Sequence, residues 1–364
     1  MAGIYVHIPF CRSRCVYCDF YSTTSLGSRQ RYVDALCKEL EMRSSYIKER
    51  VRTIYLGGGT PSQLSIGQLQ QLFSVLGGAE EVTIECNPDD VTPKFADALS
   101  QLPVNRVSMG AQTFNDERLR FLCRRHHAAQ VSEAVKILRQ SGIDNISVDL
   151  MYGFPAETLD EWQRDIDAVL ALNVEHLSAY ALQYEEGTPL YKMLERGEVS
   201  EVDEELSRRM YYMLKDCLEK AGYEHYEISN FARPGRRSRH NSSYWHQTPY
   251  LGLGAAAHSF DGRNRQWNVE NIDEYIKGVE QGKPAVECEV LTPDNHYNEI
   301  VMTALRTCDG LLLDALNPHY RDYCLEQAKP FLDNHLLVLE GSRLRLSREG
   351  LFVSDMLMTE LMRV

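Results

Sequence analysis

A short β-branched run followed by an amphipathic helix recurs about every 30 residues through the first half of this 364-residue chain. After the opening Ile4-Tyr5-Val6-His7-Ile8, five such runs are centred on Ile54, Ile84, Val107, Val148 and Ala179. Helices are predicted between them because apolar residues repeat at helical spacing, as at Leu69, Leu72, Phe73 and Leu76. Strands that alternate with helices form parallel sheets with right-handed crossovers. Six such units can remain an open sheet or curl, and we predict a partial (β/α)6 barrel.

The regular repeat ends near Leu182, and the C-terminal part of the chain has a different pattern. From about Leu291 helical patterns predominate, and residues 336–346 predict a hairpin that turns at Gly341. We therefore expect an α/β chain in three parts. These are a partial barrel over residues 1–230, a connecting region over 231–290, and a small C-terminal α+β domain of helices and a hairpin over 291–364.

The acidic composition limits the partners of the chain. Lysine and arginine number 39 and aspartate and glutamate 52, which gives a net charge of −13. So negative a protein is a poor candidate for binding nucleic acid or an anionic membrane. No apolar run approaches the ~20 residues that a membrane-spanning helix needs. The N-terminus is expected to begin a strand at once rather than to act as a signal peptide, so we predict a reducing, cytoplasmic location.

Three of the ten cysteines follow the first predicted strand closely, as Cys11-x3-Cys15-x2-Cys18. Clustered thiols in a reducing compartment indicate a metal site or redox chemistry. A structural zinc ion would take a fourth protein ligand, for which His7 and Asp19 are the nearest candidates. Because no second CxxC pair occurs, three thiolates and an open position favour a 4Fe–4S cluster with one exchangeable iron site.

Glycines and polar residues mark the ends of the next predicted strands. Gly57-Gly58-Gly59-Thr60-Pro61 follows the second strand, where glycines let the backbone approach a ligand closely. Glu85 ends the third strand, Gln112 ends the fourth and Asp149 lies in the fifth. Alone, the glycine segment is equally explained by a turn, and each polar residue is better explained by a solvated strand end or a hydrogen-bonded buried group. Since the carboxyl ends of parallel strands meet at one face of a barrel, their convergence predicts a functional site there.

The cysteine loop, with Tyr17 before its last cysteine, resembles the signature of radical S-adenosylmethionine (SAM) enzymes. The whole chain is similar to the oxygen-independent coproporphyrinogen III oxidase group of that superfamily. The resemblance implies a 4Fe–4S cluster on Cys11, Cys15 and Cys18, with SAM as the further ligand. It also implies that the cofactors are contacted by Tyr5, Tyr17, Gly58, Gly59, Thr60, Glu85, Gln112, Arg124 and Asp149.

The chain departs from the group's sequence patterns at two positions. Arg124 is matched through Leu122-Cys123-Arg124-Arg125-His126, similar to the family pattern Leu-Gly-Arg-x-His, so that Cys123 stands at the glycine position. Phe20 stands where the coproporphyrinogen-oxidising branch has a fourth cysteine. The second departure counts against porphyrinogen oxidation and favours the other branch, the HemW family of heme chaperones.

His240-Asn241-Ser242-Ser243-Tyr244-Trp245 matches the HNxxYW motif associated with heme binding in HemW proteins. The resemblance implies heme as a further cofactor bound at His240, since imidazole is a common axial ligand of heme iron. Family members often have a cysteine two positions before this histidine, where Ser238 stands here. On residue chemistry alone, a hydrogen-bonded His240 that braces a structural corner is an equal alternative. Neighbouring side chains that suit heme propionates are Arg233, Arg236, Arg237 and Arg239.

The resemblance therefore predicts a heme chaperone that binds heme and, with a SAM-coordinated 4Fe–4S cluster, passes it to acceptor proteins such as respiratory heme proteins. Two alternatives stay open. A radical SAM oxidoreductase would act on coproporphyrinogen III or another small molecule. A non-enzymatic zinc or iron–sulfur protein would use the thiols only structurally. The first two functions share the cluster, so the residues leave open whether this chain cleaves SAM.

Overall fold

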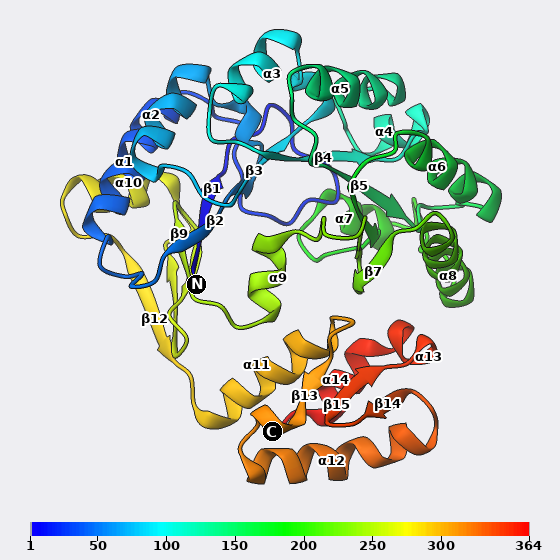
Figure 1. Cartoon of the computed structure of the whole chain (residues 1–364). Helices are drawn as coiled ribbons and strands as arrows, with labels where there is room; N and C mark the ends of the chain where they lie inside the picture. The colour runs from blue at the N-terminus through cyan, green and yellow to red at the C-terminus, as the bar shows by residue number, and fades with distance from the viewer. Residues whose placement is uncertain (1, 364) are drawn as a thin grey trace.

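The computed structural model describes residues 2–363 and places six parallel strands in sequence order. They are β1 (Ala2–Ile8), β2 (Val51–Gly58), β3 (Glu81–Cys86), β4 (Arg106–Gln112), β5 (Ile146–Tyr152) and β6 (His176–Ala181). Each strand from β1 to β6 pairs in parallel with the next. β6 then pairs with the antiparallel β8 (Asn230–Ala232) rather than with β1, so the barrel stays open. This arrangement confirms the predicted partial (β/α)6 barrel (Figure 1).

Helices cover the outer face of these strands (Figure 1). The longer ones are α1 (Arg29–Met42), α2 (Ile66–Leu76), α3 (Pro93–Ser100), α5 (Ala128–Gln140), α6 (Leu159–Ala171) and α8 (Glu204–Lys220). Two short helices, α4 (Asp116–Phe121) and α7 (Pro189–Glu195), lie in the loops after β4 and β6. No helix within residues 2–363 is long and apolar enough to cross a membrane.

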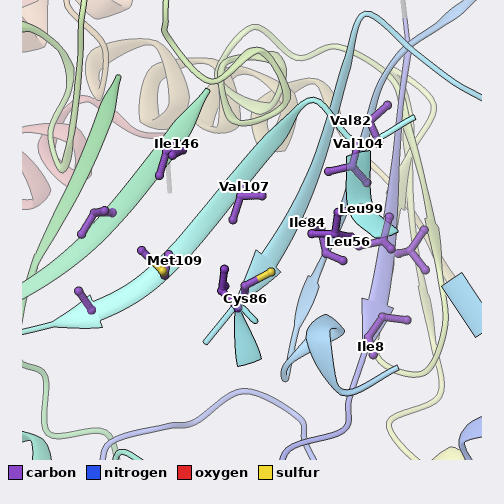
Figure 2. Packing of buried hydrophobic residues seen from close by; sticks show 14 of the residues in the cluster. Ile8, Leu56, Val82, Ile84, Cys86, Leu99, Val104, Val107, Met109 and Ile146 are labelled. Atoms are coloured by element: carbon purple, nitrogen blue, oxygen red, sulfur yellow. The ribbon is translucent and has the colours of Figure 1, made fainter. Parts of the chain in front are cut away.

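The main hydrophobic core lies between the strands and these helices. Figure 2 shows part of it, with Ile8, Leu56, Ile84 and Val107 fully buried on neighbouring strands. Burying a side chain of this size contributes roughly 1.5–3 kcal/mol. Because successive side chains of a strand point to opposite faces, the residues between these ones point into the barrel. That inner face is polar, and Tyr5, Tyr55, Glu85, Ser108 and Asp149 are among its residues.

Residues 224–290 extend the sheet on both sides. β7 (Glu224–Glu227) and β8 continue it beyond β6, while β9 (Tyr250–Leu253), β10 (His258–Phe260), β11 (Asn264–Asn268) and β12 (Val286–Val290) continue it beyond β1. Helices α9 (Arg239–Trp245) and α10 (Ile272–Glu280) lie between these strands in the chain. The connecting region expected at 231–290 is therefore part of the barrel sheet. Its strands are too short to show a hydrophobic period, so the pattern does not reveal them.

The C-terminal residues form a second, smaller core. Its elements are α11 (Pro293–Leu305), β13 (Leu311–Leu312), α12 (Pro318–Asp333), β14 (Leu337–Glu340), β15 (Arg343–Leu346), α13 (Arg348–Phe352) and α14 (Ser354–Leu361). The strands pair in the order β13-β15-β14, and β14 with β15 is the predicted hairpin. This unit meets the barrel through the ion pair of Arg306 with Glu227 (3.1 Å) and a backbone hydrogen bond from Cys308 N to Tyr226 O (3.0 Å).

Glu39 is a fully buried carboxylate that joins α1 to the strands beyond β1. One of its oxygens accepts hydrogen bonds from Arg43 Nη1 (3.1 Å) and Asn268 Nδ2 (2.8 Å). The other accepts from Gly254 N (2.9 Å) and Tyr275 Oη (2.6 Å). Its partners come from the end of α1, from β11, from α10 and from the turn after β9, so one carboxylate fixes how these elements pack.

Replacing Glu39 with alanine should lower the free energy of unfolding by about 3–5 kcal/mol, because Arg43 would lose the carboxylate of a buried ion pair. The other donors would be left without an acceptor, which adds to the loss. Urea denaturation followed by circular dichroism measures the change. Glu41→Ala, at an exposed position of the same helix, is the control and should change stability little. Equal stabilities for the two variants would contradict the role of Glu39.

Candidate functional site

Cys11, Cys15 and Cys18 lie on the loop after β1, at the carboxyl ends of the barrel strands. All three thiols are free and partly buried. Burial, with smaller contributions from the charges of Cys15 and Cys11, raises the pKa of Cys18 to about 11. Burial also raises the pKa of Cys11, whose Sγ lies 3.4 Å from Thr60 Oγ1. The three thiols are therefore near enough to one another to interact electrostatically.

These donors fit an iron–sulfur cluster better than a single metal ion. Within residues 2–363, no three His, Cys, Asp or Glu side chains converge closely enough to hold one ion. His7, a candidate fourth zinc ligand, has Nδ1 3.1 Å from Tyr5 Oη and Nε2 2.9 Å from Tyr21 O. A 4Fe–4S cluster spreads its thiolates over separate irons and so accepts a wider spacing of the sulfurs. Three thiolates on this loop would leave one iron for an external ligand.

Close packing against β1 and β3 requires the glycines at the end of β2. Gly58 has a φ of +105°, and a Cβ there would collide with the ring of His7. A Cβ at Gly59 would lie 2.8 Å from Ile8 O, and one at Gly57 would lie 2.9 Å from Glu85 Oε1. The glycine segment is therefore held directly against the strand that leads into the cysteine loop.

Glu85 and Asp149 are buried carboxyl groups on the inner face of the barrel. Glu85 accepts hydrogen bonds from Tyr55 Oη (2.7 Å) and Gly58 N (3.1 Å). Burial raises the pKa of Glu85 to about 7, although these hydrogen bonds oppose the shift. Burial also raises the pKa of Asp149, which has Ser108 Oγ 3.5 Å from both of its oxygens. Glu85 therefore gains its negative charge near neutral pH, and a cationic ligand would favour that charged form.

Arg124 reaches the same end of the barrel from the loop after α4. Its Nη2 donates to Gly110 O (2.5 Å) and Asn87 Oδ1 (2.8 Å), and its Nη1 lies 3.6 Å from Cys15 Sγ. Its Nε is buried without a hydrogen-bond partner in residues 2–363. Cys123 has a φ of +60°, a left-handed conformation that favours glycine. This backbone geometry explains why the family pattern has glycine there and supports the match of Arg124.

The side chain of Gln112 lies over Gly110, next to Arg124. A Cβ at Gly110 would lie 2.7 Å from Gln112 Nε2 and 3.2 Å from Arg124 Nη2. Gln112 itself has a φ of +68°, which turns the chain at the end of β4. Gln112, Arg124 and Cys15 therefore lie together at the carboxyl end of this strand.

The two predicted tyrosines occupy different places. Tyr5 points into the barrel, where its ring stacks on Tyr55 with centroids 6.2 Å apart. Tyr17 is partly buried against the small apolar cluster that contains Leu122 and Phe154. Tyr17 is itself part of the cysteine loop, and burial, with the charge of the neighbouring Cys15, raises the pKa of its hydroxyl.

The site also includes residues that sequence patterns do not single out, namely Tyr55, Arg106, Ser108 and Ser178 on the strands and Asn87 just after β3. Arg106 is 1% exposed, and its Nε and Nη1 have no hydrogen-bond partner in the described part of the chain. Most of them could have been predicted from the alternation of side chains along a strand, which puts every second residue on the same face of the sheet. Tyr55 precedes Gly57 of the predicted glycine segment by two residues, and Ser108 precedes the predicted Gln112 by four, so each lies at an even spacing from a predicted site position.

The His240 motif lies at the opposite end of the barrel. α9 packs at the amino ends of the strands, where Thr53 Oγ1 is 2.9 Å from His240 Nδ1 and Glu81 Oε1 accepts from His240 N (2.9 Å). A Cβ at Gly3 would lie 3.2 Å from the ring. His240 is 1% exposed, and its Nε2 is 2.9 Å from Tyr244 Oη. The structure therefore does not bring His240 to the cysteine loop, and in this conformation its ring braces α9.

Comparison with known proteins defines the class. Residues 5–169 match the radical SAM superfamily, and residues 291–353 match the HemN C-terminal domain. The solved structure of coproporphyrinogen III oxidase (HemN) from Escherichia coli has the same fold, with a TM-score of 0.84 at 22% identity over 99% of this chain and 89% of that chain. The superfamily match and the cysteine loop identify a radical SAM protein.

Relatives that match most of the chain define the family more narrowly. The heme chaperone HemW of Lactococcus lactis is 34% identical over 359 residues, 95% of this chain and 93% of the relative. HemW of Mycobacterium tuberculosis is 35% identical over 97% of this chain and 93% of its own. The mitochondrial radical S-adenosyl methionine domain-containing protein 1 of Bos taurus is 30% identical over 99% of this chain and 87% of its own. The chain belongs to the HemW family.

Replacing Cys11, Cys15 and Cys18 together with alanine should abolish iron and sulfide binding, because a 4Fe–4S cluster is held by cysteine thiolates. Iron analysis and visible absorption after anaerobic reconstitution measure the cluster. A variant with alanine at Cys37, Cys217 and Cys288 is the control and should keep it. Full iron content in the loop variant would refute the assignment.

Replacing Arg124 with alanine should weaken SAM binding by about 2–5 kcal/mol if its guanidinium pairs with the SAM carboxylate in a buried site. Calorimetry on the reconstituted protein measures the affinity. Arg120→Ala, an exposed arginine on α4, is the matched control and should leave SAM binding unchanged. The same affinity in Arg124→Ala as in the parent would remove this residue from the SAM site.

Proposed function

We propose that this chain is a heme chaperone, which binds heme and, with a SAM-coordinated 4Fe–4S cluster, passes the heme to acceptor proteins. The observation that carries the proposal is the similarity to HemW proteins, at 34% and 35% identity over nearly the whole chain. The motif at residues 240–245 and Phe20 at the place of the fourth cysteine agree with this branch of the superfamily.

Residues at the carboxyl ends of the strands would hold the cluster and SAM. When bound, these two cofactors would supply one-electron chemistry. Cys11, Cys15 and Cys18 would bind the cluster. Arg124 would donate to the SAM carboxylate through its unpaired Nε, because a buried guanidinium nitrogen needs an acceptor. Glu85 would accept hydrogen bonds from the SAM amino group in its ionised form.

Separation of the two ends of the barrel supports transport of heme rather than its chemical conversion. The cysteine loop lies at the carboxyl ends of the strands, and α9 with the HNxxYW motif lies at their amino ends. Heme bound near α9 would leave the SAM site unobstructed. A porphyrinogen oxidised by radical chemistry would instead have to lie beside SAM, since hydrogen abstraction needs direct contact.

Phe20 also supports binding without oxidation. Its side chain is 64% exposed on the cysteine loop, where the oxidising branch has a thiol. A phenyl ring offers no ligand or redox group in that place, so this chain lacks one element of the oxidase site.

We place this activity in the cytoplasm, with heme proteins, including respiratory ones, as acceptors. All ten cysteines are free. Free thiols that must stay reduced to bind a cluster suit a reducing compartment.

Titration of the protein with ferric heme should shift the Soret band and saturate. Anaerobic incubation with coproporphyrinogen III, SAM and a reductant should give no protoporphyrinogen, measured by fluorescence after oxidation. The variant without the three loop cysteines should still bind heme, because the heme motif lies at the other end of the barrel. Failure of the parent to bind heme would refute the proposal. Steady formation of protoporphyrinogen would assign the protein to the oxidase branch, and stoichiometric zinc in a colourless protein would favour a structural role for the thiols.

A further inference from the structure

A histidine outside the HNxxYW motif is better placed to bind heme iron than the one within it. In residues 240–246 the chain reads His240-Asn241-Ser242-Ser243-Tyr244-Trp245-His246. Both ring nitrogens of His240 lie 2.9 Å from hydroxyl oxygens, those of Thr53 and Tyr244, in a fully buried setting. To bind iron, His240 would have to break a hydrogen bond and leave the barrel. Its movement would also expose to solvent the contacts of α9 with β1 and β2.

His246 has the opposite surroundings. It follows α9 directly, and its side chain is 55% exposed. Its Nδ1 lies 2.6 Å from Ser242 O, and since a carbonyl oxygen only accepts, the ring proton is on Nδ1. In the neutral ring the lone pair is therefore on Nε2. A histidine that donates one N–H to a backbone carbonyl and presents the other nitrogen is the usual arrangement of a metal ligand.

The carboxylate of Asp309 lies 3.6 Å from His246 Nε2, which is beyond hydrogen-bond distance. Asp309 is 44% exposed on the loop after α11, so it can turn aside without a burial cost. The lone pair of Nε2 is accordingly open to an incoming ligand at the junction between the barrel and the C-terminal unit.

A cation and a thiol lie at the same junction. Arg237 Nη1 is 3.6 Å from Asp309 Oδ2, and Arg237 Nη2 donates to Cys308 Sγ at 3.5 Å. Heme carries two propionates, and arginine is well suited to pair with carboxylates. Arg237 is partly exposed and pairs with the two partly exposed carboxylates of Glu224 (3.2 Å) and Asp309 (3.6 Å), so a propionate can replace one of them.

Ser238, at the amino end of α9, is not placed to contact a heme. It is fully buried and caps the helix, where its Oγ accepts from Asn241 N at 3.3 Å. A thiol in its place would be buried as well. Of the two histidines on this segment, His240 is buried and His246, just after the motif, is exposed.

We propose that His246 Nε2 is the axial ligand of heme iron in this chain, with Arg237 pairing a propionate, and that His240 positions α9. The inference rests on the proposed heme binding and assigns its site. Since iron in heme already has four porphyrin nitrogens, a single exposed imidazole is sufficient as protein ligand. Such an open site lets an acceptor protein reach the heme.

Ferric heme titration of the full chain tests the assignment, with the Soret position and the dissociation constant as readouts. His246→Ala should move the Soret band and weaken binding at least about tenfold, as loss of a metal-site contact does. Added imidazole should restore the parental Soret position in this variant. His319→Ala, an exposed histidine on α12, is the matched control and should behave as the parent.

His240→Gln and Cys308→Ala complete the test. Glutamine can keep a hydrogen bond to Thr53, so this variant should keep the parental Soret position with lower thermal stability. Parental spectra and affinity in His246→Ala would overturn the inference while leaving the proposed function intact. A Soret change in His240→Gln or Cys308→Ala instead would also overturn it. Absence of any Soret shift in the parent would refute the proposed heme binding itself.

Discussion

Strand β1 holds both functional ends of this protein in place. It pairs in parallel with β2 on one side and β9 on the other, so its backbone is fixed along its length. The cysteine loop leaves its carboxyl end. At its amino end Gly3 leaves room for the ring of His240, because a Cβ there would lie 2.9 Å from Thr53 Oγ1 and 3.2 Å from that ring. Movement of β1 would therefore disturb the cluster loop and α9 together.

The two faces of the barrel strands have different roles, since the outer face stabilises the fold and the inner face carries residues of the candidate site. Apolar side chains point outward to the helices and form the core, while the inner face is polar and carries Glu85, Asp149 and Arg106. Buried polar groups need partners, and Arg106 and Arg124 have nitrogens without one in residues 2–363. α9 is attached at the amino end of this polar interior by Glu81, which accepts from the backbone N–H groups of Arg239 (3.0 Å) and His240 (2.9 Å).

Most of the barrel, and the meeting of the candidate site residues at the carboxyl ends of its strands, could be predicted from sequence. Strand and helix periods are local signals, and Glu85, Gln112 and Asp149 lie at strand ends that parallel topology brings together. Arg124 needed the family pattern, and the left-handed backbone at Cys123 explains the one mismatch. The strands β9–β12 could not be predicted, because they are short and join the sheet through the pairing of β9 with β1, two segments about 250 residues apart.

The sequence by itself determined the alternation of strands and helices, the thiol spacing, and the family, since each depends on residue types at fixed spacing along the chain. Only the tertiary structure decided what each histidine near α9 can do. His240 and His246 are one residue type on the same short segment. His240 faces the barrel and has both nitrogens hydrogen-bonded, whereas His246 faces solvent with one nitrogen open. Burial depends on contacts with β1 and β2 from the other end of the sequence, and no local pattern records those contacts.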